Sequence, residues 1–322
     1  MMKIDAVITW VDGNDPEHKS KRLRYGPPSL FKVKDIAAST RYTSVGEIFW
    51  CVASLNRFAP WLNKIYIVTD SQNPGLDEFM TENFPDGFIP MEIVDHKVIF
   101  KGYENFLPTF NSISLETMTW RIPGLSDHFI EFNDDLMLTA PVLPQDFFTS
   151  DGKVICYADW NSVHLTKLTR LLKPRKFGVV PVTTKGSHLN GARLAGGRFR
   201  FLRLEHCQKA LRRDFYEDYF RDHEEELVRN ISYRFRSADQ FTPQVLQYMT
   251  LHRNGNCIVR SSGSDFFYFI PKNKKGYFER KMKQLTRFSG KFACFNNVDL
   301  ATEEQLKILV TWIERCLDIR FR

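Results

Sequence analysis

The stretch HFIEFNDDLML, residues 128–138, places an aromatic and aliphatic run directly before Asn133, Asp134 and Asp135. The run has the length and composition of a strand buried in a sheet. Three polar residues at its end are costly to bury without partners. Two interpretations are open. A polar strand end followed by a turn is the simpler one for an isolated Asp-Asp pair, and a carboxylate pair that holds Mg²⁺ or Mn²⁺ is the other.

The same pattern recurs along the first half of the chain. Short apolar runs end at carboxylates in IDAVITWVDG (Asp12), KIYIVTD (Asp70), MEIVD (Asp95) and KVICYAD (Asp159). Helical patterns lie between them, which predicts an α/β fold: a Rossmann-like, mostly parallel sheet flanked by helices. Because such sheets bind ligands at the carboxyl ends of their strands, we expect these carboxylates to converge on one rim.

Several helices are predicted from capping signals and apolar spacing. They are a helix opened by a Ser44/Glu47 capping box, then 112–121, 212–230, 243–252 after a Thr242 cap, and 302–320 with a Thr302/Gln305 capping box. The basic, glycine-rich segment after residue 160 predicts loops and short elements, with an edge strand where Arg198, Arg200 and Arg203 alternate with apolar residues. We therefore expect a sheet core over 1–160 and a helical extension over 161–322, joined in one integrated domain.

Composition bounds the class of protein. With 322 residues and 43% hydrophobic content the chain can bury a full core, and its net charge of +7 suits an anionic substrate, a membrane surface or nucleic acid. Six scattered cysteines without a CxxC pair indicate neither a zinc site nor a disulfide framework. No leader pattern and no apolar run of about 18 residues is present, which predicts a cytoplasmic protein whose membrane contact, if any, is peripheral.

Two further segments carry residues suited to chemistry. TWVDGNDP, residues 9–16, joins a strand to a turn-forming loop, where Gly13 would let backbone amides approach a phosphate; a plain β-turn explains it equally. The segment lacks GxGxxG and GxxxxGK[ST], so it supports neither NAD nor ATP chemistry of those types. His206 and Arg236 stand out only weakly by themselves, and the basic stripe near residue 200 has no nucleic-acid-binding motif behind it.

Taken together, these segments resemble the Stealth family of sugar-1-phosphate transferases. The resemblance rests on four blocks in the family's order: IDAVITWVDGNDP; residues 41–74 with LPTFNSISLETMTWRIPGLSDHFIEFNDDLML; EHCQKALRRDFYEDYFRDHEEELVRNISYRFRSADQ; and FACFNNVD. His206 and Arg236 match the family's histidine and arginine. Two positions depart from the pattern, because Gln208 stands where the family has proline and Asn297 where it often has aspartate.

The resemblance implies transfer of a hexose-1-phosphate, such as N-acetylglucosamine-1-phosphate, from a UDP-sugar to a hydroxyl of a bacterial capsular or surface glycan. It implies Asp134 and Asp135 as Mg²⁺ or Mn²⁺ ligands, with His206 and Arg236 as further catalytic residues. The nucleotide, metal and supporting contacts fall on Trp10, Asp12, Gly13, Asp15, Arg41, Asn133, Glu116 and Arg121. A lipid-linked oligosaccharide or a polysaccharide is the expected acceptor, which favours peripheral contact with the inner face of the cell membrane; no nucleic acid is expected, and the oligomeric state stays open.

Two rival functions remain at this stage. A metal-dependent glycosyltransferase would use paired aspartates in the same way but would release UDP. A non-catalytic protein that binds glycan or nucleic acid through residues 193–213 would show no turnover.

Overall fold

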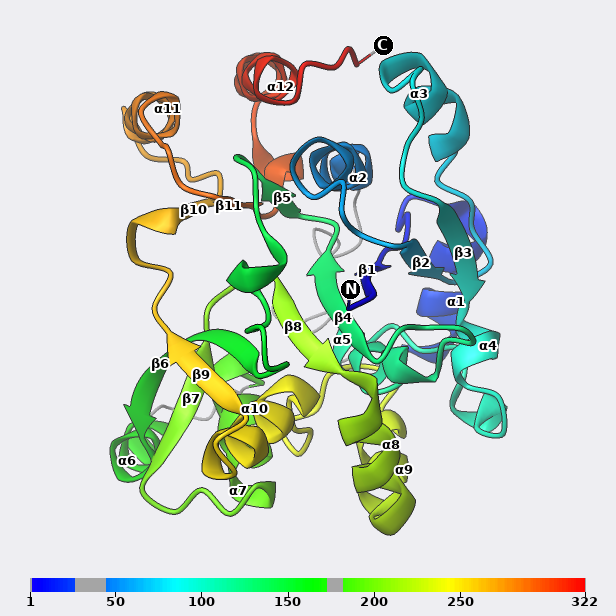
Figure 1. Cartoon of the computed structure of the whole chain (residues 1–322), viewed down its shortest axis with the longest axis vertical. Helices are drawn as coiled ribbons and strands as arrows, with labels where there is room; N and C mark the ends of the chain where they lie inside the picture. Colours follow the sequence, from blue (N-terminus) through cyan, green and yellow to red (C-terminus); the bar gives the residue numbers. More distant parts are fainter. Residues whose placement is uncertain (1, 27–44, 173–181, 322) are drawn as a thin grey trace.

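The main sheet of the protein has five strands in the order β3-β2-β1-β4-β8 in the computed structural model, which describes residues 2–26, 45–172 and 182–321 (Figure 1). They are β3 (Met91–Asp95), β2 (Ile65–Thr69), β1 (Ile4–Thr9), β4 (His128–Asn133) and β8 (Lys209–Arg212). The first four pair in parallel, and β8 lies antiparallel to β4. The predicted α/β fold with a mostly parallel sheet is confirmed.

Two three-stranded sheets extend this core. One has the order β10-β11-β5, formed by β10 (Phe266–Phe269), β11 (Phe292–Phe295) and β5 (Leu136–Leu138). The other has the order β7-β6-β9, formed by β7 (Arg200–Leu204), β6 (Val154–Ser162) and β9 (Cys257–Arg260). The edge strand expected near residue 200 is therefore present as β7. The second half of the chain supplies strands to all three sheets, so it is not a purely helical extension.

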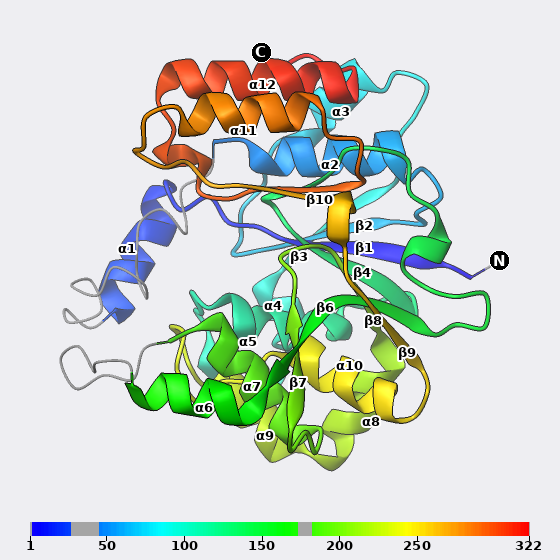
Figure 2. The ribbon, with the colours of Figure 1, turned by 90° about the vertical axis from the view of Figure 1, so that its left-hand side faces the viewer.

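Helices cover both faces of the main sheet, as Figure 2 shows. On one side lie α2 (Glu47–Phe58), α3 (Leu76–Asn83), α11 (Tyr277–Thr286) and α12 (Glu303–Leu317). On the other lie α4 (His96–Ile99), α5 (Ser112–Glu116), α8 (Arg213–Asp222), α9 (Glu224–Ile231) and α10 (Pro243–Arg253). The remaining helices are α1 (Pro16–Tyr25), α6 (Val163–Leu172) and α7 (Thr184–Leu194). Coverage on both faces explains why the strands of the sheet read as continuous apolar runs.

The predicted rim of carboxylates is present, with one exception. Asp95 ends β3, and Asp12, Asp70 and Asp134 follow β1, β2 and β4, so these residues share the carboxyl end of four parallel strands. Asp159 does not, because β6 continues through Ser162 and belongs to a different sheet. The prediction for Asp159 was wrong because the apolar run stops before its strand does.

The helix predictions hold with changed boundaries. The capping box of Thr302 and Gln305 opens α12, and Pro243 opens α10, although the Thr242 hydroxyl donates to Ser187 instead of capping. The helix expected over 112–121 is α5 followed by a 3₁₀ turn, Thr119–Arg121, and the one expected over 212–230 is divided into α8 and α9. Helix α2 begins at Glu47, and Ser44 lies outside the described residues.

Helix α7 was missed because its glycines suggested a loop. A Cβ atom added at Gly191 would lie 2.7 Å from the Thr242 carbonyl oxygen, so this glycine lets α7 pack closely against the start of α10. Here glycine serves helix packing and does not break the helix. The composition of the segment gave no sign of that difference.

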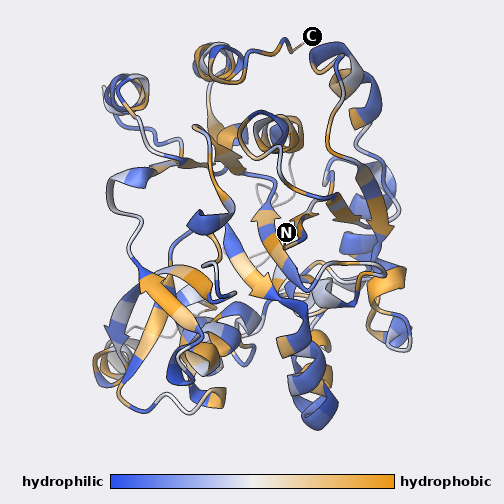
Figure 3. Cartoon of the chain, viewed as in Figure 1, coloured by the Kyte–Doolittle hydropathy of each residue, from blue (hydrophilic) through white to orange (hydrophobic). Residues whose placement is uncertain are grey.

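The largest apolar core spans both halves of the chain. It joins Val7, Ile67 and Phe132 of the main sheet to residues such as Leu189 of α7 and Leu246 of α10. A second cluster packs α2, α11 and α12 against the sheet of β10, β11 and β5. Apolar residues gather in the strands in Figure 3, whereas α8 and α9 carry many hydrophilic ones. The domain boundary at residue 160 remains a prediction.

Candidate active site

The residues Asp134 and Asp135 form the turn between β4 and β5, where the main sheet meets the sheet of β10, β11 and β5. Strand β11 pairs with β5 directly after this turn, and the Phe295 amide donates to the Asp135 carbonyl at 2.9 Å. The turn is therefore fixed by backbone pairing on both sides. Both interpretations of the Asp-Asp pair remain compatible with this geometry, because a turn at a strand end also presents its carboxylates at the ligand-binding rim.

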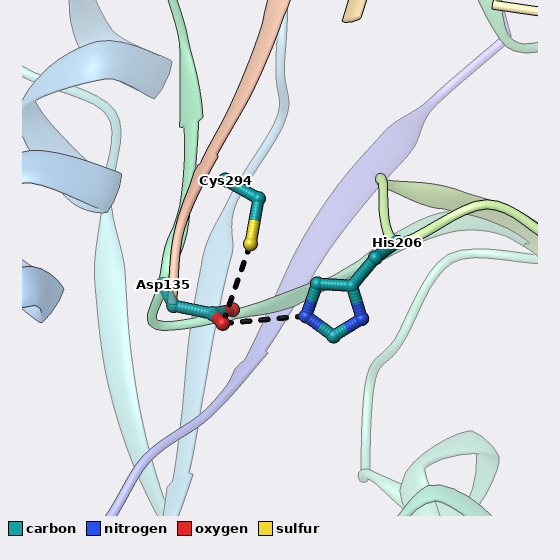
Figure 4. Close-up of side chains that lie close together, drawn as sticks. All are labelled: Asp135, His206 and Cys294. Atoms are coloured by element: carbon teal, nitrogen blue, oxygen red, sulfur yellow. Dashed lines mark hydrogen bonds and ion pairs between the residues drawn. The ribbon is translucent and has the colours of Figure 1, made fainter. Parts of the chain in front are cut away.

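Asp135 is the centre of a cluster of side chains drawn in Figure 4. Its Oδ2 atom lies 3.2 Å from His206 Nε2 and 3.5 Å from Cys294 Sγ. The Asn296 amide donates to the same oxygen at 2.8 Å. The Asp135 side chain is 15% exposed and that of His206 is 45% exposed, so the cluster opens to solvent on the histidine side.

Strand pairing brings these distant residues together. Glu131 of β4 lies opposite Lys209 of β8, and that antiparallel register carries His206, three residues before Lys209, to the end of β4. Strand β11 carries Cys294, which faces Leu136 of β5 in the register. The cluster therefore depends on contacts between three parts of the sequence.

The two adjacent aspartates have opposite electrostatic character. Burial alone would raise the pKa of Asp135, but the His206 charge and the hydrogen bonds from His206, Asn296 and Cys294 lower it to about 2. Burial raises the pKa of Asp134 well above its ordinary value, and the neighbouring charges of Asp135 and Glu47 add to this. Asp135 is thus the ionised member of the pair, and Asp134 is the one that a nearby cation would stabilise in its charged form.

The oxygens at this turn suit a hard divalent cation. Asp135 Oδ1 and Asn133 Oδ1 are buried and have no hydrogen-bond partner among the described residues. Oxygen atoms of carboxylates and amides are the protein ligands that Mg²⁺ and Mn²⁺ prefer. Asp134 and Asp135 therefore fit the predicted metal site in donor chemistry, and Asn133, predicted as a cofactor contact, offers a further oxygen beside them.

The loop after β1 is held against the loop after β2. The Asp12 amide donates to Gln72 Oε1 and its carbonyl accepts from Gln72 Nε2, both at 2.9 Å. Asp15 caps α1, because its Oδ1 accepts from the His18 amide at 2.7 Å. Trp10 is buried and Gly13 stands between these two anchors. The predicted nucleotide-binding loop thus lies at the carboxyl rim, with Asp15 in a structural contact.

Arg236 is placed beside this loop. Its Nη2 donates to Ser112 Oγ at 2.6 Å, at the start of α5. The preceding residue, Phe235, stacks on Phe110, and Val11 packs against this aromatic pair. Arg236 therefore lies near the β1 loop, and its described contact is with Ser112, not with Asp135. Arg41 lies outside the described residues.

The other two predicted residues have well-defined partners. Glu116 accepts from Gln244 Nε2 at 2.9 Å, and the same nitrogen donates to the buried Glu131. Arg121 donates to the carbonyl oxygens of Ile99 and Lys101, both at 2.8 Å. Of the two, Arg121 holds backbone in place, which agrees with a supporting role.

Cys294 and Asn296 are site residues that the sequence reasoning did not assign. Both lie in the short block FACFNNVD, whose Asn296-Asn297 pair weakened the expectation of a charged ligand there. Asn296 instead acts as a neutral donor to Asp135. The only indication in the sequence that these two residues belong to the site was that FACFNNVD is one of the four family blocks.

The fold defines an α/β protein whose polar residues gather at the carboxyl ends of parallel strands. Within it, residues 2–27 match the model of Stealth protein conserved region 1, and residues 41–156 match that of conserved region 2. The resemblance to the Stealth family is therefore confirmed, and the chain carries the first two conserved regions of these proteins.

Similar proteins in bacteria are named polysaccharide phosphotransferases. The chain is 42% identical over 152 residues to a capsular polysaccharide phosphotransferase, WcwK, of Streptococcus pneumoniae, an alignment that covers 47% of this chain and 43% of the relative. It is 35% identical over 260 residues to an exopolysaccharide phosphotransferase of Streptomyces coelicolor, covering 77% of this chain and 39% of the relative. The chain thus spans less than half the length of these relatives.

Solved structures with a distant likeness include the galactosyltransferase LgtC with donor and acceptor sugar analogues. It has a TM-score of 0.44 and 10% identity, with 95% of each chain covered. The bifunctional glycosyltransferase WbbM has a TM-score of 0.46 and 10% identity, covering 96% of this chain and 51% of that one. Separately, within the described residues no helix combines the length and apolar character that a membrane crossing requires.

Proposed function

We propose that this protein is a sugar-1-phosphate transferase that moves a hexose-1-phosphate from a UDP-sugar to a hydroxyl group of a bacterial surface glycan. The observation that carries the proposal is the contact between Asp135 and His206, which joins the second and third family blocks at the rim of the sheet. The names of the curated relatives support the reaction class. Transfer of N-acetylglucosamine-1-phosphate is one instance of this reaction.

In this reaction the acceptor oxygen attacks the phosphorus bonded to the sugar. The new bond joins that oxygen to phosphorus, and the bond between this phosphorus and the bridging oxygen breaks. UMP leaves with the bonding electrons, and the glycosidic bond of the sugar stays intact. Such a transfer depends on positioning and charge stabilisation more than on covalent catalysis.

His206 is the proposed acceptor of the hydroxyl proton. Its Nε2 faces Asp135, so its Nδ1 points away from that carboxylate (Figure 4) and is the nitrogen available to substrate. Asp135 would orient the imidazole and stabilise its protonated form, as a carboxylate does for a catalytic histidine.

Asn133, Asp134 and Asp135 would hold the divalent cation, Mg²⁺ or Mn²⁺. Such an ion supplies charge neutralisation at a diphosphate and its leaving group. The buried oxygens of Asn133 and Asp135 that have no partner in the described part of the chain support this assignment.

Arg236 would bind non-bridging phosphate oxygens through two nitrogens, a task for which the planar guanidinium is better suited than an ammonium group. The loop of Trp10, Asp12, Gly13 and Asp15 would hold the nucleotide. Val11 of this loop packs against Phe235, the residue before Arg236, so the loop lies close to the proposed phosphate contact. Arg41 and Glu116 are proposed substrate contacts.

The partners follow from the chemistry. A lipid-linked oligosaccharide or a polysaccharide would be the acceptor, and the net charge of +7 would favour peripheral contact with the anionic inner face of the cell membrane. We place the protein in the cytoplasm, where residues 1–160 would bind the donor and residues 161–322 would complete the same catalytic domain. The shared apolar core supports that integration.

The decisive experiment identifies the released nucleotide. Purified protein is incubated with UDP-N-acetylglucosamine, UDP-galactose or UDP-glucose, together with Mg²⁺ and a crude glycan acceptor, and nucleotides are separated by chromatography. Metal-dependent UMP that disappears with Asp135→Asn supports the proposal. Release of UDP would make the protein a glycosyltransferase, and saturable glycan binding without turnover would make it a binding protein.

A further inference from the structure

The cluster around Asp135 includes a soft ligand that a magnesium site does not need. Asp135 Oδ2, one His206 ring nitrogen and Cys294 Sγ all lie within 4.8 Å of one another. Mg²⁺ binds oxygen almost exclusively, whereas carboxylate, imidazole and thiolate together are a ligand set typical of Zn²⁺. The spacing of the cysteines gave no sign of it, because the three ligands come from positions 135, 206 and 294.

The distances match the edges of a zinc tetrahedron. Bond lengths of about 2.0 Å to nitrogen and oxygen and about 2.3 Å to sulfur place neighbouring ligands roughly 3.2–3.6 Å apart. The observed separations from Asp135 Oδ2 are 3.2 Å to His206 Nε2 and 3.5 Å to Cys294 Sγ. Two of the three edges therefore already have the required length. The third can close through a small movement of the exposed His206 ring.

The surroundings supply the other features of such a site. Asn296 donates to Asp135 Oδ2 and would continue to orient the carboxylate, as partners of metal ligands commonly do. Cys294 is buried, and the exposed edge of His206 gives an ion a path from solvent. Three protein ligands leave a fourth position for water or a phosphate oxygen.

We propose that Asp135, His206 and Cys294 form a Zn²⁺ site that overlaps the active site and inhibits the enzyme when it is filled. Binding replaces the Cys294 sulfur–hydrogen bond with a sulfur–zinc bond and releases the proton to solvent. Zinc on His206 Nε2 moves the ring proton to Nδ1, so Nδ1 can no longer accept the proton of the acceptor hydroxyl, and Asp135 Oδ2 is occupied as well. The inhibitory consequence rests on the proposed function; the metal site does not.

Cobalt spectroscopy tests the site without any enzyme assay. The metal-free 322-residue chain is titrated with Co²⁺, which replaces Zn²⁺ in tetrahedral sites and absorbs visibly when it is four-coordinate. We expect visible bands and a thiolate-to-cobalt charge-transfer band, both abolished by one equivalent of Zn²⁺. Cys294→Ser should remove the charge-transfer band, and His206→Ala should weaken Zn²⁺ binding at least about tenfold.

Two controls keep the result interpretable. Cys316→Ser removes a thiol that bonds the Thr139 carbonyl away from the site, and its spectrum should equal that of the wild type. If burial of Cys294 makes its serine variant unstable by circular dichroism, the exposed His206→Ala variant still decides the matter. An octahedral spectrum without charge transfer, or equal Zn²⁺ affinity in His206→Ala, would overturn the site.

The activity arm separates this inference from the proposed function. Micromolar Zn²⁺ should stop UMP release, excess Mg²⁺ with a chelator should restore it, and Cys294→Ser should be less sensitive. A cobalt–thiolate spectrum in a protein without transferase activity would retain the site and reject the function. If Zn²⁺ at concentrations that displace Co²⁺ from the site leaves UMP release unchanged, the inhibition is rejected.

Discussion

Asp135 Oδ2 and His206 Nε2 lie 3.2 Å apart although 71 positions separate them in the sequence. The antiparallel pairing of β4 with β8 brings the two residues together. Asn296, which follows β11, donates a hydrogen bond to the same Asp135 oxygen. Substitution of either residue should therefore lower the catalytic rate more than the stability of the fold.

The first prediction concerns this pair. His206→Ala should lower kcat by roughly 10²–10⁴, the usual contribution of a general base, and Asp135→Asn should lower it at least as much. Asp159→Asn is the matched control, because Asp159 is an exposed aspartate of β6 outside the rim. Rates of UMP release with unchanged circular dichroism provide the measurement, and a fully active His206→Ala enzyme would exclude the base assignment.

The second prediction concerns Arg236. Arg236→Lys keeps the charge but loses the two-nitrogen fork, so we expect a fall in kcat/KM of about tenfold or more. Arg198→Lys, at an exposed position, should be neutral. The measurement is the rate of UMP release as a function of donor concentration for both variants. Unchanged kcat/KM in Arg236→Lys would show that the guanidinium serves only the structural contact with Ser112.

The third prediction concerns Arg121, whose described bonds are to backbone oxygens. Arg121→Ala leaves the carbonyls of Ile99 and Lys101 without these donors, which should lower the free energy of unfolding by about 1–3 kcal/mol. KM for the donor should stay unchanged. Urea unfolding and donor kinetics test both halves, with the exposed Arg221→Ala as control. A raised KM with unchanged stability would instead place Arg121 in the substrate site.

The main sheet could be predicted from the sequence because a local run of apolar residues marks each of its parallel strands. Strands β1, β2 and β4 are apolar runs buried on both faces, and β3 is a partly exposed edge strand. The carboxyl ends of all four lie at one rim. The capping box of α12 is similarly local. These features depend on neighbours in sequence, which is why a pattern predicts them.

The cluster itself required tertiary pairing. Cys294 reaches Asp135 only because β11 pairs with β5, and His206 only because β8 joins the edge of the main sheet. Neither pairing leaves a periodic signal in the short strands involved. Family blocks associated His206 with the aspartates and included the segment of Cys294, but the contact between Cys294 and Asp135 became visible only in the fold.

The fourth prediction concerns Glu131, which is fully buried in the middle of β4. Burial, with the charge of Glu116, raises the pKa of Glu131 from 4.5 to about 8, against the opposing effects of Lys209 and Gln244. The folded protein therefore holds this proton where the unfolded chain loses it, and stability should fall as pH rises from about 4.5 to 8.

Glu131→Gln should flatten this dependence, because the amide has no proton to lose. Relative to the wild type, the variant should gain stability with rising pH, by an amount on the order of a few kcal/mol. Thermal unfolding between pH 5 and 9 measures it, and the exposed Glu279→Gln is the control. Parallel curves for wild type and Glu131→Gln would show that Glu131 is ionised throughout.

The last prediction concerns His96 in the first turn of α4, which is 2% exposed and has no hydrogen-bond partner for either ring nitrogen among the described residues. Burial lowers the pKa of His96 from 6.5 to about 4, against the raising effect of Asp70 and Asp95. Because the unfolded chain takes up this proton first, stability should fall as pH drops from 6.5 toward 4, by up to about 3 kcal/mol. His96→Phe should remove that part of the acid sensitivity, whereas His164→Phe, at an exposed position, should retain it. Urea midpoints at pH 4.5, 5.5 and 7 distinguish the variants, and equal acid sensitivity in His96→Phe and the wild type would assign the loss to other groups.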